Sequence, residues 1–216
     1  MKELSRSALL SASNLLAFTV IGTAILAFTF GQTKDTIRQS EEREKLRLIS
    51  QILPANLYDN QVVRDTLKLK PDDLLGTTED SVAYRARLHG KPTAVVLEAV
   101  APEGYGGDIN LLVAIRASGE IAGVRVVSDN ETPGLGDYIE IAKSKWIRNF
   151  DGASLERYND EDWHVKKDGG KFDYMAGATI SPRAVVKAVH HALQYFARHR
   201  NELFAAAPAP QQGGKS

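Results

Sequence analysis

The chain has 216 residues, which is enough for one domain of ordinary size with further segments at its ends. Lysine plus arginine and aspartate plus glutamate each number 27, so the net charge is zero and nothing indicates a nucleic-acid partner. The absence of cysteine excludes disulfides, thiolate metal sites, cysteine-bound clusters and c-type haem attachment, so an electron carrier of this composition needs an organic cofactor or a metal bound by nitrogen and oxygen.

Residues 8–32 form the first predicted element, a transmembrane helix. No charged residue occurs between Ser7 and Thr33, and about 20 apolar residues suffice to cross the hydrocarbon core as a helix. The alternative is a cleaved signal peptide, but its apolar region usually spans only about 7–15 residues, and no clear cleavage site follows this one. We therefore expect an uncleaved single anchor behind a short N-terminal cytoplasmic segment, residues 1–7.

Residues 33–60 are predicted to form a juxtamembrane helix. The segment is rich in charged residues, and its larger apolar residues recur at spacings of three and four, which places them on one helical face. These residues are Leu46, Ile49, Leu53 and Leu57. The helix is expected to break near Pro54, because proline cannot continue the helical hydrogen bonds. Such a stripe is typical of packing against a core or a partner helix.

An antiparallel sheet is predicted within the folded domain, residues 61–204. The nearly continuous apolar run Ala94–Val100 is typical of a buried strand, and Ile109–Arg116 and Ile121–Ser128 form a predicted hairpin with a glycine in its turn. The stretch before these strands shows few strong periods, and Pro71-Asp72-Asp73 marks only a turn or a helix start.

The hairpin is followed directly by Glu131-Thr132-Pro133-Gly134-Leu135-Gly136-Asp137. Pro133-Gly134 predicts a tight turn, and Gly134 and Gly136 let backbone N–H groups approach a planar or anionic ligand closely. If this segment is considered alone, the simpler interpretation is that it forms an ordinary structural turn without a ligand.

The most informative stretch is Asp173-Tyr174-Met175-Ala176-Gly177-Ala178-Thr179-Ile180-Ser181-Pro182-Arg183. Ser181 followed by Pro182 is typical of an N-cap and a first helical residue, so a helix is expected to begin just after Thr179. Unpaired N–H groups and the positive end of the helix dipole would hold a phosphate beside Thr179, and the small residues before it would let that phosphate reach the backbone. An ordinary loop-to-helix junction is the alternative from spacing alone.

The helix after this motif is predicted to pack one apolar face on the sheet. That face consists of Val185, Val186, Val189, Leu193 and Phe196. Residues 205–216 lack core-forming side chains and predict a disordered tail.

Two further expectations concern side chains that could serve a cofactor. Tyr138, Trp146, Trp163 and Tyr174 are expected in the core rather than against a ligand. The five histidines are isolated or share one helical segment without flanking carboxylates, so no metal site is expected.

Two patterns resemble the FMN-binding domains of membrane redox complexes. Asp-x-x-Ala-Gly-Ala-Thr, residues 173–179, resembles the flavinylation motif of Rnf complexes and of sodium-pumping NADH:quinone reductases, and departs from it at Ala176, where serine or threonine is more usual. Residues 101–189 resemble RnfG, a component of the Rnf electron-transport complex, more specifically, which separates the chain from the related flavin-carrying component of the quinone reductase. The segments that carry this resemblance are Gly104-Tyr105-Gly106-Gly107, Ile109-x-Leu111-Leu112-Val113, Gly123-Val124-Arg125-Val126, Glu131–Asp137, Trp146-Ile147 and Trp163-x-Val165-Lys166-Lys167-Asp168-Gly169-Gly170.

The resemblance implies that Thr179 carries FMN through a phosphoester bond and that no residue of the chain is catalytic by itself. The other implied cofactor contacts are Asp173, Gly177, Ala178 and Ile180 around the attachment, Thr132, Leu135 and Gly136 beside the flavin ring, and Lys166 near the phosphate or the ring.

The resemblance also implies an α+β fold, with a single N-terminal transmembrane helix followed by an FMN-binding domain that has an antiparallel sheet and packed helices. The implied function is an electron-relay component of an Rnf-type complex, which couples electron transfer between NADH and ferredoxin to ion translocation. Its partners would be the other Rnf components and, for maturation, a flavin transferase. The alternatives are a flavin-carrying component of a sodium-pumping quinone reductase or related relay, and a flavin-free anchored interaction domain.

The charges that flank the predicted anchor leave its orientation open. Lys2 and Arg6 precede the anchor, whereas the positive residues that follow it are interleaved with acidic ones. A simple count of lysine and arginine would place the domain in the cytoplasm. The resemblance implies instead an anchor in the bacterial inner membrane and a periplasmic domain, which we expect because large domains can translocate despite their charge.

Overall fold

The computed structural model describes residues 2–205, without the side chains of residues 2–11, 35–39, 41, 42 and 46. The disordered tail predicted for residues 205–216 lies, apart from Ala205, outside the described residues. The chain divides into two compact units, Met1–Lys45 and Leu46–Ser216. Helix α1, Lys2–Ile52, begins in the first unit and ends in the second.

The first unit contains a helix long and apolar enough to cross a membrane. This stretch, Ala12–Lys34, has 23 residues, and no part of it is buried by the rest of the protein. The hydroxyls of Thr19, Thr29 and Thr33 each donate a hydrogen bond to the backbone carbonyl four residues earlier. These three hydroxyls are thereby satisfied within the helix, as polar groups in hydrocarbon must be.

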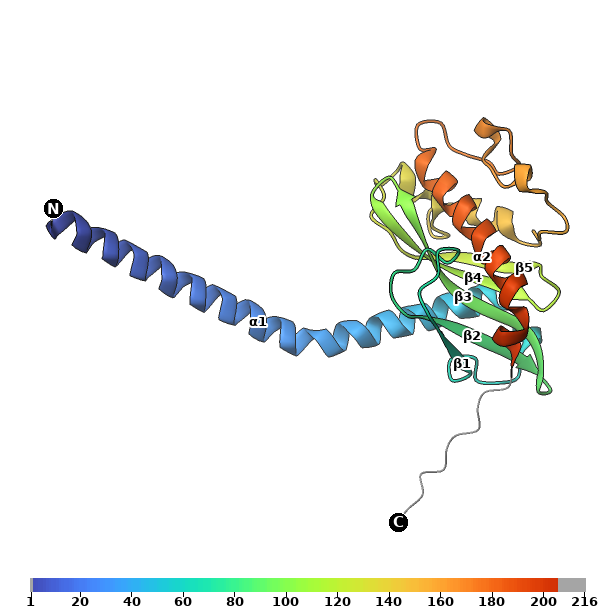
Figure 1. The fold of residues 1–216 in the computed structure, drawn as a ribbon, viewed down its shortest axis with the longest axis horizontal. Helices are drawn as coiled ribbons and strands as arrows, with labels where there is room; N and C mark the ends of the chain where they lie inside the picture. The colour runs from blue at the N-terminus through green and yellow to red at the C-terminus, as the bar shows by residue number, and fades with distance from the viewer. Residues whose placement is uncertain (1, 206–216) are drawn as a thin grey trace, which may run out of the picture. The chain divides into compact units, whose positions relative to one another are not determined.

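The second unit is built on a five-stranded antiparallel sheet, which confirms the α+β class (Figure 1). The strands are β1 (Thr66–Leu69), β2 (Ser81–Leu88), β3 (Lys91–Gly104), β4 (Gly107–Arg116) and β5 (Ile121–Ser128). They lie in sequence order, and each pairs with the next. The strand and hairpin predicted from the apolar runs lie within β3, β4 and β5, whereas β1 and β2 were not predicted.

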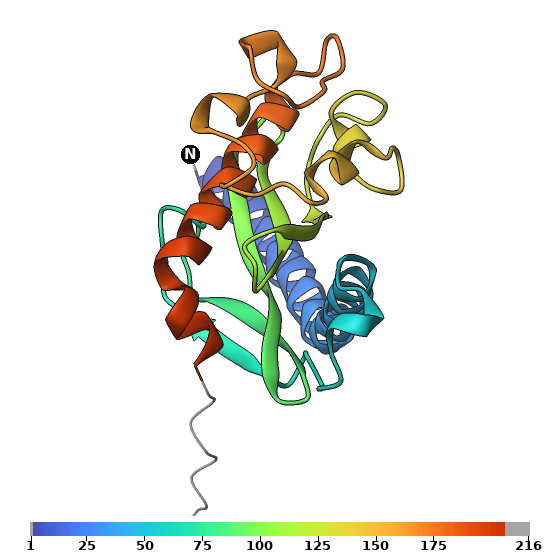
Figure 2. The same cartoon turned by 90° about the vertical axis from the view of Figure 1, so that its right-hand side faces the viewer.

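Alternate side chains of the sheet enter two apolar clusters, one on each face, because successive residues of a strand point in opposite directions. In β3, Val95 and Leu97 belong to the cluster that contains helix α2, Ile180–Phe204. The neighbouring Val96 belongs to the cluster formed with the last turn of α1. Figure 2 shows α2 and the end of α1 on opposite sides of the sheet. All five residues of the predicted face of α2 are buried, which confirms its packing on the sheet.

The C-terminal end of α2 is held by two arginines of β2. Arg85 and Arg87 donate hydrogen bonds of 2.8 and 3.1 Å to the backbone carbonyl of Ala205, and both pair with the carboxylate of Asp65. Positive side chains are favourable at this end of a helix, where carbonyl groups lack helical partners. The clamp fixes the position of α2 across the sheet and therefore also that of its N-terminal end.

Short 3-10 helices fill the connections outside the sheet. They are η1 (Ala55–Leu57), η2 (Gly136–Ile139), η3 (Trp146–Phe150), η4 (Asp160–Asp162) and η5 (Lys166–Asp168). The last four belong to the long segment between β5 and α2, which brings the turn at Glu131 and the motif at Thr179 to the same end of the sheet.

Candidate functional site

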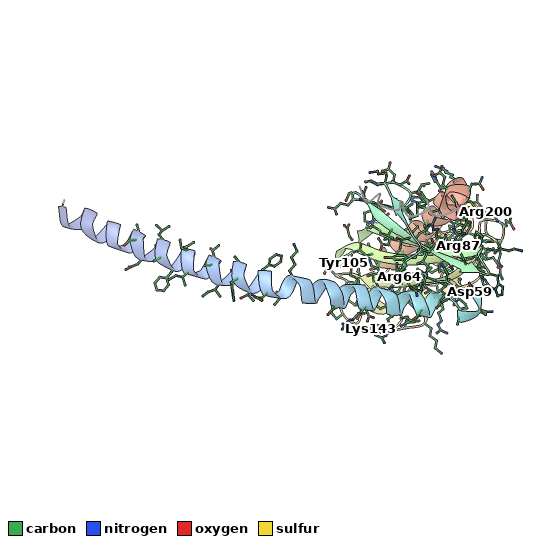
Figure 3. All side chains as sticks on the ribbon, turned by 90° about the horizontal axis from the view of Figure 1, so that it is seen from below. Asp59, Arg64, Arg87, Tyr105, Lys143 and Arg200 are labelled. Atoms are coloured by element: carbon green, nitrogen blue, oxygen red, sulfur yellow. The ribbon has the colours of Figure 1, made fainter. Side chains whose placement is uncertain are left out.

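Three segments that are distant in the sequence line one pocket of about 300 Å³. They are the β3–β4 turn, the turn after β5 and the start of α2. The lining residues are Tyr105, Glu131, Thr132, Leu135, Gly136, Gly177, Ala178, Thr179, Ile180 and Ser181. The pocket thus brings together every cofactor contact predicted from the sequence except Asp173 and Lys166. Figure 3 labels Tyr105, which lies at the opposite end of the folded unit from Arg200.

A tight turn delivers the motif to the pocket. The Ala178 N–H donates to the Met175 carbonyl over 3.1 Å, and Gly177 has a φ of 89°, a conformation that favours glycine. The hydroxyl of Tyr138 accepts from the Met175 N–H over 3.0 Å and donates to the Ala178 carbonyl over 3.3 Å. Burial raises the pKa of Tyr138, so this hydroxyl stays a neutral donor over the usual pH range. The turn is therefore anchored from the core.

Helix α2 begins at Ile180, immediately after Thr179, as predicted. The interpretation of Ser181 as its N-cap is wrong, because Ser181 is the second helical residue and is buried. Its hydroxyl donates a hydrogen bond of 2.6 Å to Oε2 of Glu131, which lies 50 residues earlier in the chain. Pro182 is accordingly the third helical residue, a position in the first turn where its missing N–H removes no helical hydrogen bond.

The start of α2 presents donors to the pocket. Within residues 2–205, the backbone N–H groups of Thr179, Ile180 and Ser181 donate no hydrogen bond. Such N–H groups, together with the positive end of the helix dipole, form a site for a phosphate or another anion. The side chains of Tyr105, Leu135 and Ile180 are exposed around the pocket and offer apolar surface to a flat ring.

Asp173 and Lys166 lie outside the pocket and contact each other. The Lys166 Nζ lies 2.5 Å from Oδ1 of Asp173, and both side chains are more than half exposed. The indole N–H of Trp146 donates to the Asp173 backbone carbonyl over 2.6 Å, which fixes the chain at the start of the motif. A contact between Lys166 and a cofactor stays a prediction.

Three residues of the pocket were not predicted from the sequence as cofactor contacts. Tyr105 comes from a glycine-rich turn, Glu131 from the start of the Pro-Gly turn and Ser181 from the helix. These residues share a role only because the fold brings them together in the pocket. No local spacing pattern in the sequence predicts that they lie close to one another.

The aromatic residues divide into buried and exposed groups. Tyr138, Trp146 and Trp163 are buried, and Tyr138 and Trp146 meet edge to face with ring centroids 5.7 Å apart. Tyr174 is 39% exposed, so the expectation of a core position is wrong for it. In the described part of the chain, no three side chains of His, Asp or Glu are grouped so that they could hold a metal ion.

Comparisons with known proteins agree with this architecture. Residues 104–194 match the FMN-binding domain family, and residues 1–52 match the RnfG N-terminal region. The chain is 46% identical over 204 residues to the G component of the ion-translocating oxidoreductase complex of Pseudomonas aeruginosa, and the match covers 94% of this chain and 95% of the relative. It is 42% identical to the corresponding protein of Shewanella oneidensis, covering 88% of this chain and 90% of the relative. It is 41% identical to that of Vibrio cholerae, covering 92% and 94%.

Identity at this level over nearly the whole length, with both matched regions in their expected order, establishes the family. The chain belongs to the RnfG family of ion-translocating oxidoreductase (Rnf) complexes, and its folded unit carries the FMN-binding domain of that family.

Proposed function

We propose that the chain is an electron-relay component of an Rnf-type complex that couples electron transfer between NADH and ferredoxin to ion translocation, and that it carries FMN covalently on Thr179. The observation that carries the attachment is the position of Thr179, a half-buried hydroxyl residue in the pocket immediately before the first residue of α2. A phosphate joined to this hydroxyl lies within reach of N–H groups that have no acceptor in the described structure.

The pocket residues fit FMN in their chemistry. The backbone N–H groups from Thr179 to Ser181 would serve the phosphate, and the open space at Gly177, where a Cβ would meet no atom within 4 Å, leaves room for close approach. Leu135 and Ile180 would offer apolar surface to the ring, and Thr132 would offer a polar group beside it. Lys166 is paired with Asp173 outside the pocket lining, and it would contact the phosphate or the ring only by leaving that exposed ion pair.

Attachment is a single maturation step by a separate flavin transferase that uses FAD. The Thr179 oxygen forms a bond to the phosphorus of the FMN half of FAD, the pyrophosphate linkage breaks, and AMP leaves while the hydroxyl proton is transferred away. Residues 173–177 are exposed, so the motif is accessible to such an enzyme. Asp173 and Gly177 would be part of what the enzyme recognises.

In turnover, FMN supplies reversible uptake and release of electrons, while the chain binds and orients it. A covalent tether prevents loss of the cofactor outside the cytoplasm and keeps its effective concentration near neighbouring carriers high. The other components of the complex are the partners in this transfer. The chain is therefore a relay within a larger enzyme.

The test of the attachment compares wild type with Thr179→Val, which keeps the shape of the side chain and removes the hydroxyl. Both chains are produced with a matching flavin transferase, denatured, and measured by intact-mass spectrometry. The wild type is expected to gain the mass of FMN less water, and Thr179→Val to gain nothing. An unmodified wild type, from cells that flavinylate another substrate, would reject the covalent relay and favour a flavin-free interaction domain.

We propose further that the helix of the first unit anchors the chain in the bacterial inner membrane with the folded unit in the periplasm. A reporter that is active only outside the cytoplasm, fused at Gln211, is expected to give a signal. The same reporter at the N-terminus is the matched control and is expected to be silent. The reverse pattern would place the folded unit in the cytoplasm.

A further inference from the structure

Glu131 is a buried carboxylate in the wall of the Thr179 pocket, with 6% of its surface exposed. Among the described residues that line this pocket, it alone carries a formal charge. The Ser181 hydroxyl donates to its Oε2 over 2.6 Å, and the Gly106 backbone N–H donates to its Oε1 over 3.2 Å. Both oxygens accept hydrogen bonds, which is the behaviour of an ionised carboxylate.

The glycines around Glu131 leave room for this carboxylate. A Cβ atom on Gly136 would lie 2.4 Å from Oε2, and a Cβ on Gly104 would lie 2.8 Å from Oε1. Neither distance is compatible with a side chain at those positions while the carboxylate stays in place. Because Ser181 is in the first turn of α2, the negative charge also lies at the helix end that stabilises it.

The carboxylate joins the three segments that form the pocket. It belongs to the turn after β5, it holds the β3–β4 turn through Gly106, and it holds the start of α2 through Ser181. Tyr105 and Thr179 are carried by the two segments that it holds. Glu131 is thus a positioning residue that also adds a fixed charge to the pocket.

We propose that Glu131 sets the reduction potential of the flavin. With the charge of Glu131, this potential is more negative than it would be in the same pocket without that charge. This inference rests on the proposed function, since it requires FMN on Thr179. Electron uptake adds negative charge to the pocket, and a fixed negative charge in a poorly solvated environment opposes that addition. A purely structural role for Glu131 would leave the potential unchanged as long as the pocket keeps its shape.

The decisive variant is Glu131→Gln, which removes the charge and can keep both hydrogen bonds. The carbonyl oxygen of glutamine can accept from the Gly106 N–H, and its amide nitrogen can donate to the Ser181 hydroxyl. The matched control is Glu120→Gln, an exposed residue in the turn at the other end of β5. Full-length chains are flavinylated, checked for covalent FMN by intact mass, and titrated spectroelectrochemically in detergent.

We expect a more positive midpoint potential for Glu131→Gln than for wild type, and no change for Glu120→Gln. Equal potentials for wild type and a flavinylated Glu131→Gln would overturn the inference. Ser181→Ala supplies a second measurement, because it keeps the charge but removes the hydroxyl that donates to it, and its potential is expected to shift to more negative values.

If Glu131→Gln does not take up FMN, Ser181→Ala decides alone, and an unchanged or more positive potential then overturns the inference. A wild-type chain without covalent FMN contradicts the proposed function, and this inference with it. The mass measurement identifies that case before any potential is determined.

Discussion

At the residue scale, His190 shows how burial creates a group that responds to pH. Its ring stacks on Trp163 with centroids 5.0 Å apart and planes 1° from parallel, and its Nε2 lies 3.3 Å from a carboxylate oxygen of Asp160. Burial lowers the pKa of His190, and the opposing effect of Asp160 is smaller. Burial also lowers the pKa of the neighbouring His191, with a further contribution from Lys187. The folded protein therefore favours the neutral form of both rings.

This preference predicts a loss of stability in acid. Because the folded-state pKa lies below the unfolded value of about 6.5, the contribution is fully present above that pH and is lost as the pH falls through the folded-state pKa. His190→Phe keeps a flat ring on Trp163 but takes up no proton, so the fall in melting temperature below about pH 6.5 should become shallower.

The measurement is thermal unfolding of full-length chains over a pH series. His89→Asn is the control, because His89 is 85% exposed and its positive φ is tolerated by asparagine. The control should keep the wild-type pH dependence. An equally steep acid dependence in His190→Phe and wild type would show that His190 stays protonated in the folded state or contributes nothing.

Residues such as Glu131 also show where prediction from sequence ends. Thr179 was predicted as the attachment residue because residues 173–179 resemble the flavinylation motif, and a hydroxyl, small residues and an expected helix start occur together there. Ser181 was misread, since Ser-Pro is typical of a helix cap, whereas the hydroxyl bonds to Glu131 from another segment. The contact depends on how the long connection after β5 returns to the sheet, and a local pattern does not contain that information.

At the element scale, burial explains which strands could be predicted. Strands β3, β4 and β5 are covered on both faces, so their sequences contain long apolar runs. Strand β2 is also largely buried, but it contains Arg85, whose side chain is only 2% exposed. Its partners, Asp65 and the carbonyl of Ala205, lie 20 and 120 residues away. Arg85 can be buried because these distant groups pair with it. Its charge interrupts the apolar pattern from which the strand could otherwise have been predicted.

The turn after β5 gives a prediction that separates crowding from backbone strain. In Gly136→Ala, the new Cβ would lie 2.4 Å from Glu131 Oε2 and 2.9 Å from the Ser181 hydroxyl, so one or both of these groups must shift and we expect their hydrogen bond to be disrupted. We expect a loss of about 1–3 kcal/mol in the free energy of unfolding, together with a lower yield of covalent FMN.

Gly134→Ala is the matched control in the same turn. Its Cβ meets no atom within 4 Å, but its φ of 77° makes alanine unfavourable, at a cost of about 1–2 kcal/mol. The two variants should therefore lose comparable stability, as measured by urea denaturation, and only Gly136→Ala should lose FMN by intact mass. Equal FMN yields would show that the Glu131–Ser181 contact is dispensable for attachment.

At the scale of the whole molecule, the two ends of α1 are suited to different environments. Its apolar stretch, Ala12–Lys34, is exposed throughout and suited to a membrane, whereas its last turn is part of the core of the second unit. Gly123 of β5 permits that packing, because a Cβ there would lie only 3.0 Å from the Cβ of Ile52. The last turn of α1 is thus also a layer of the FMN-binding unit.

This arrangement predicts different outcomes for two deletions. Removing residues 1–34 takes away the apolar stretch and leaves the buried side chains of Leu48, Ile49, Ile52 and Leu53 in place. Removing residues 1–54 takes these four as well. Burial of each stabilises the fold by about 1.5–3 kcal/mol, so together they contribute about 6–12 kcal/mol, comparable with the roughly 5–15 kcal/mol that holds a typical domain together.

The shorter deletion should therefore give a monomer that stays in solution without detergent, unfolds cooperatively and accepts FMN from a purified transferase. The longer deletion should aggregate, because it exposes the apolar face of the sheet that includes Val96, Leu112 and Ala114. Size-exclusion chromatography and thermal unfolding distinguish the two. A cooperative transition of equal midpoint in both would mean that the sheet and α2 form a sufficient core and that the last turn of α1 serves only as a link to the membrane.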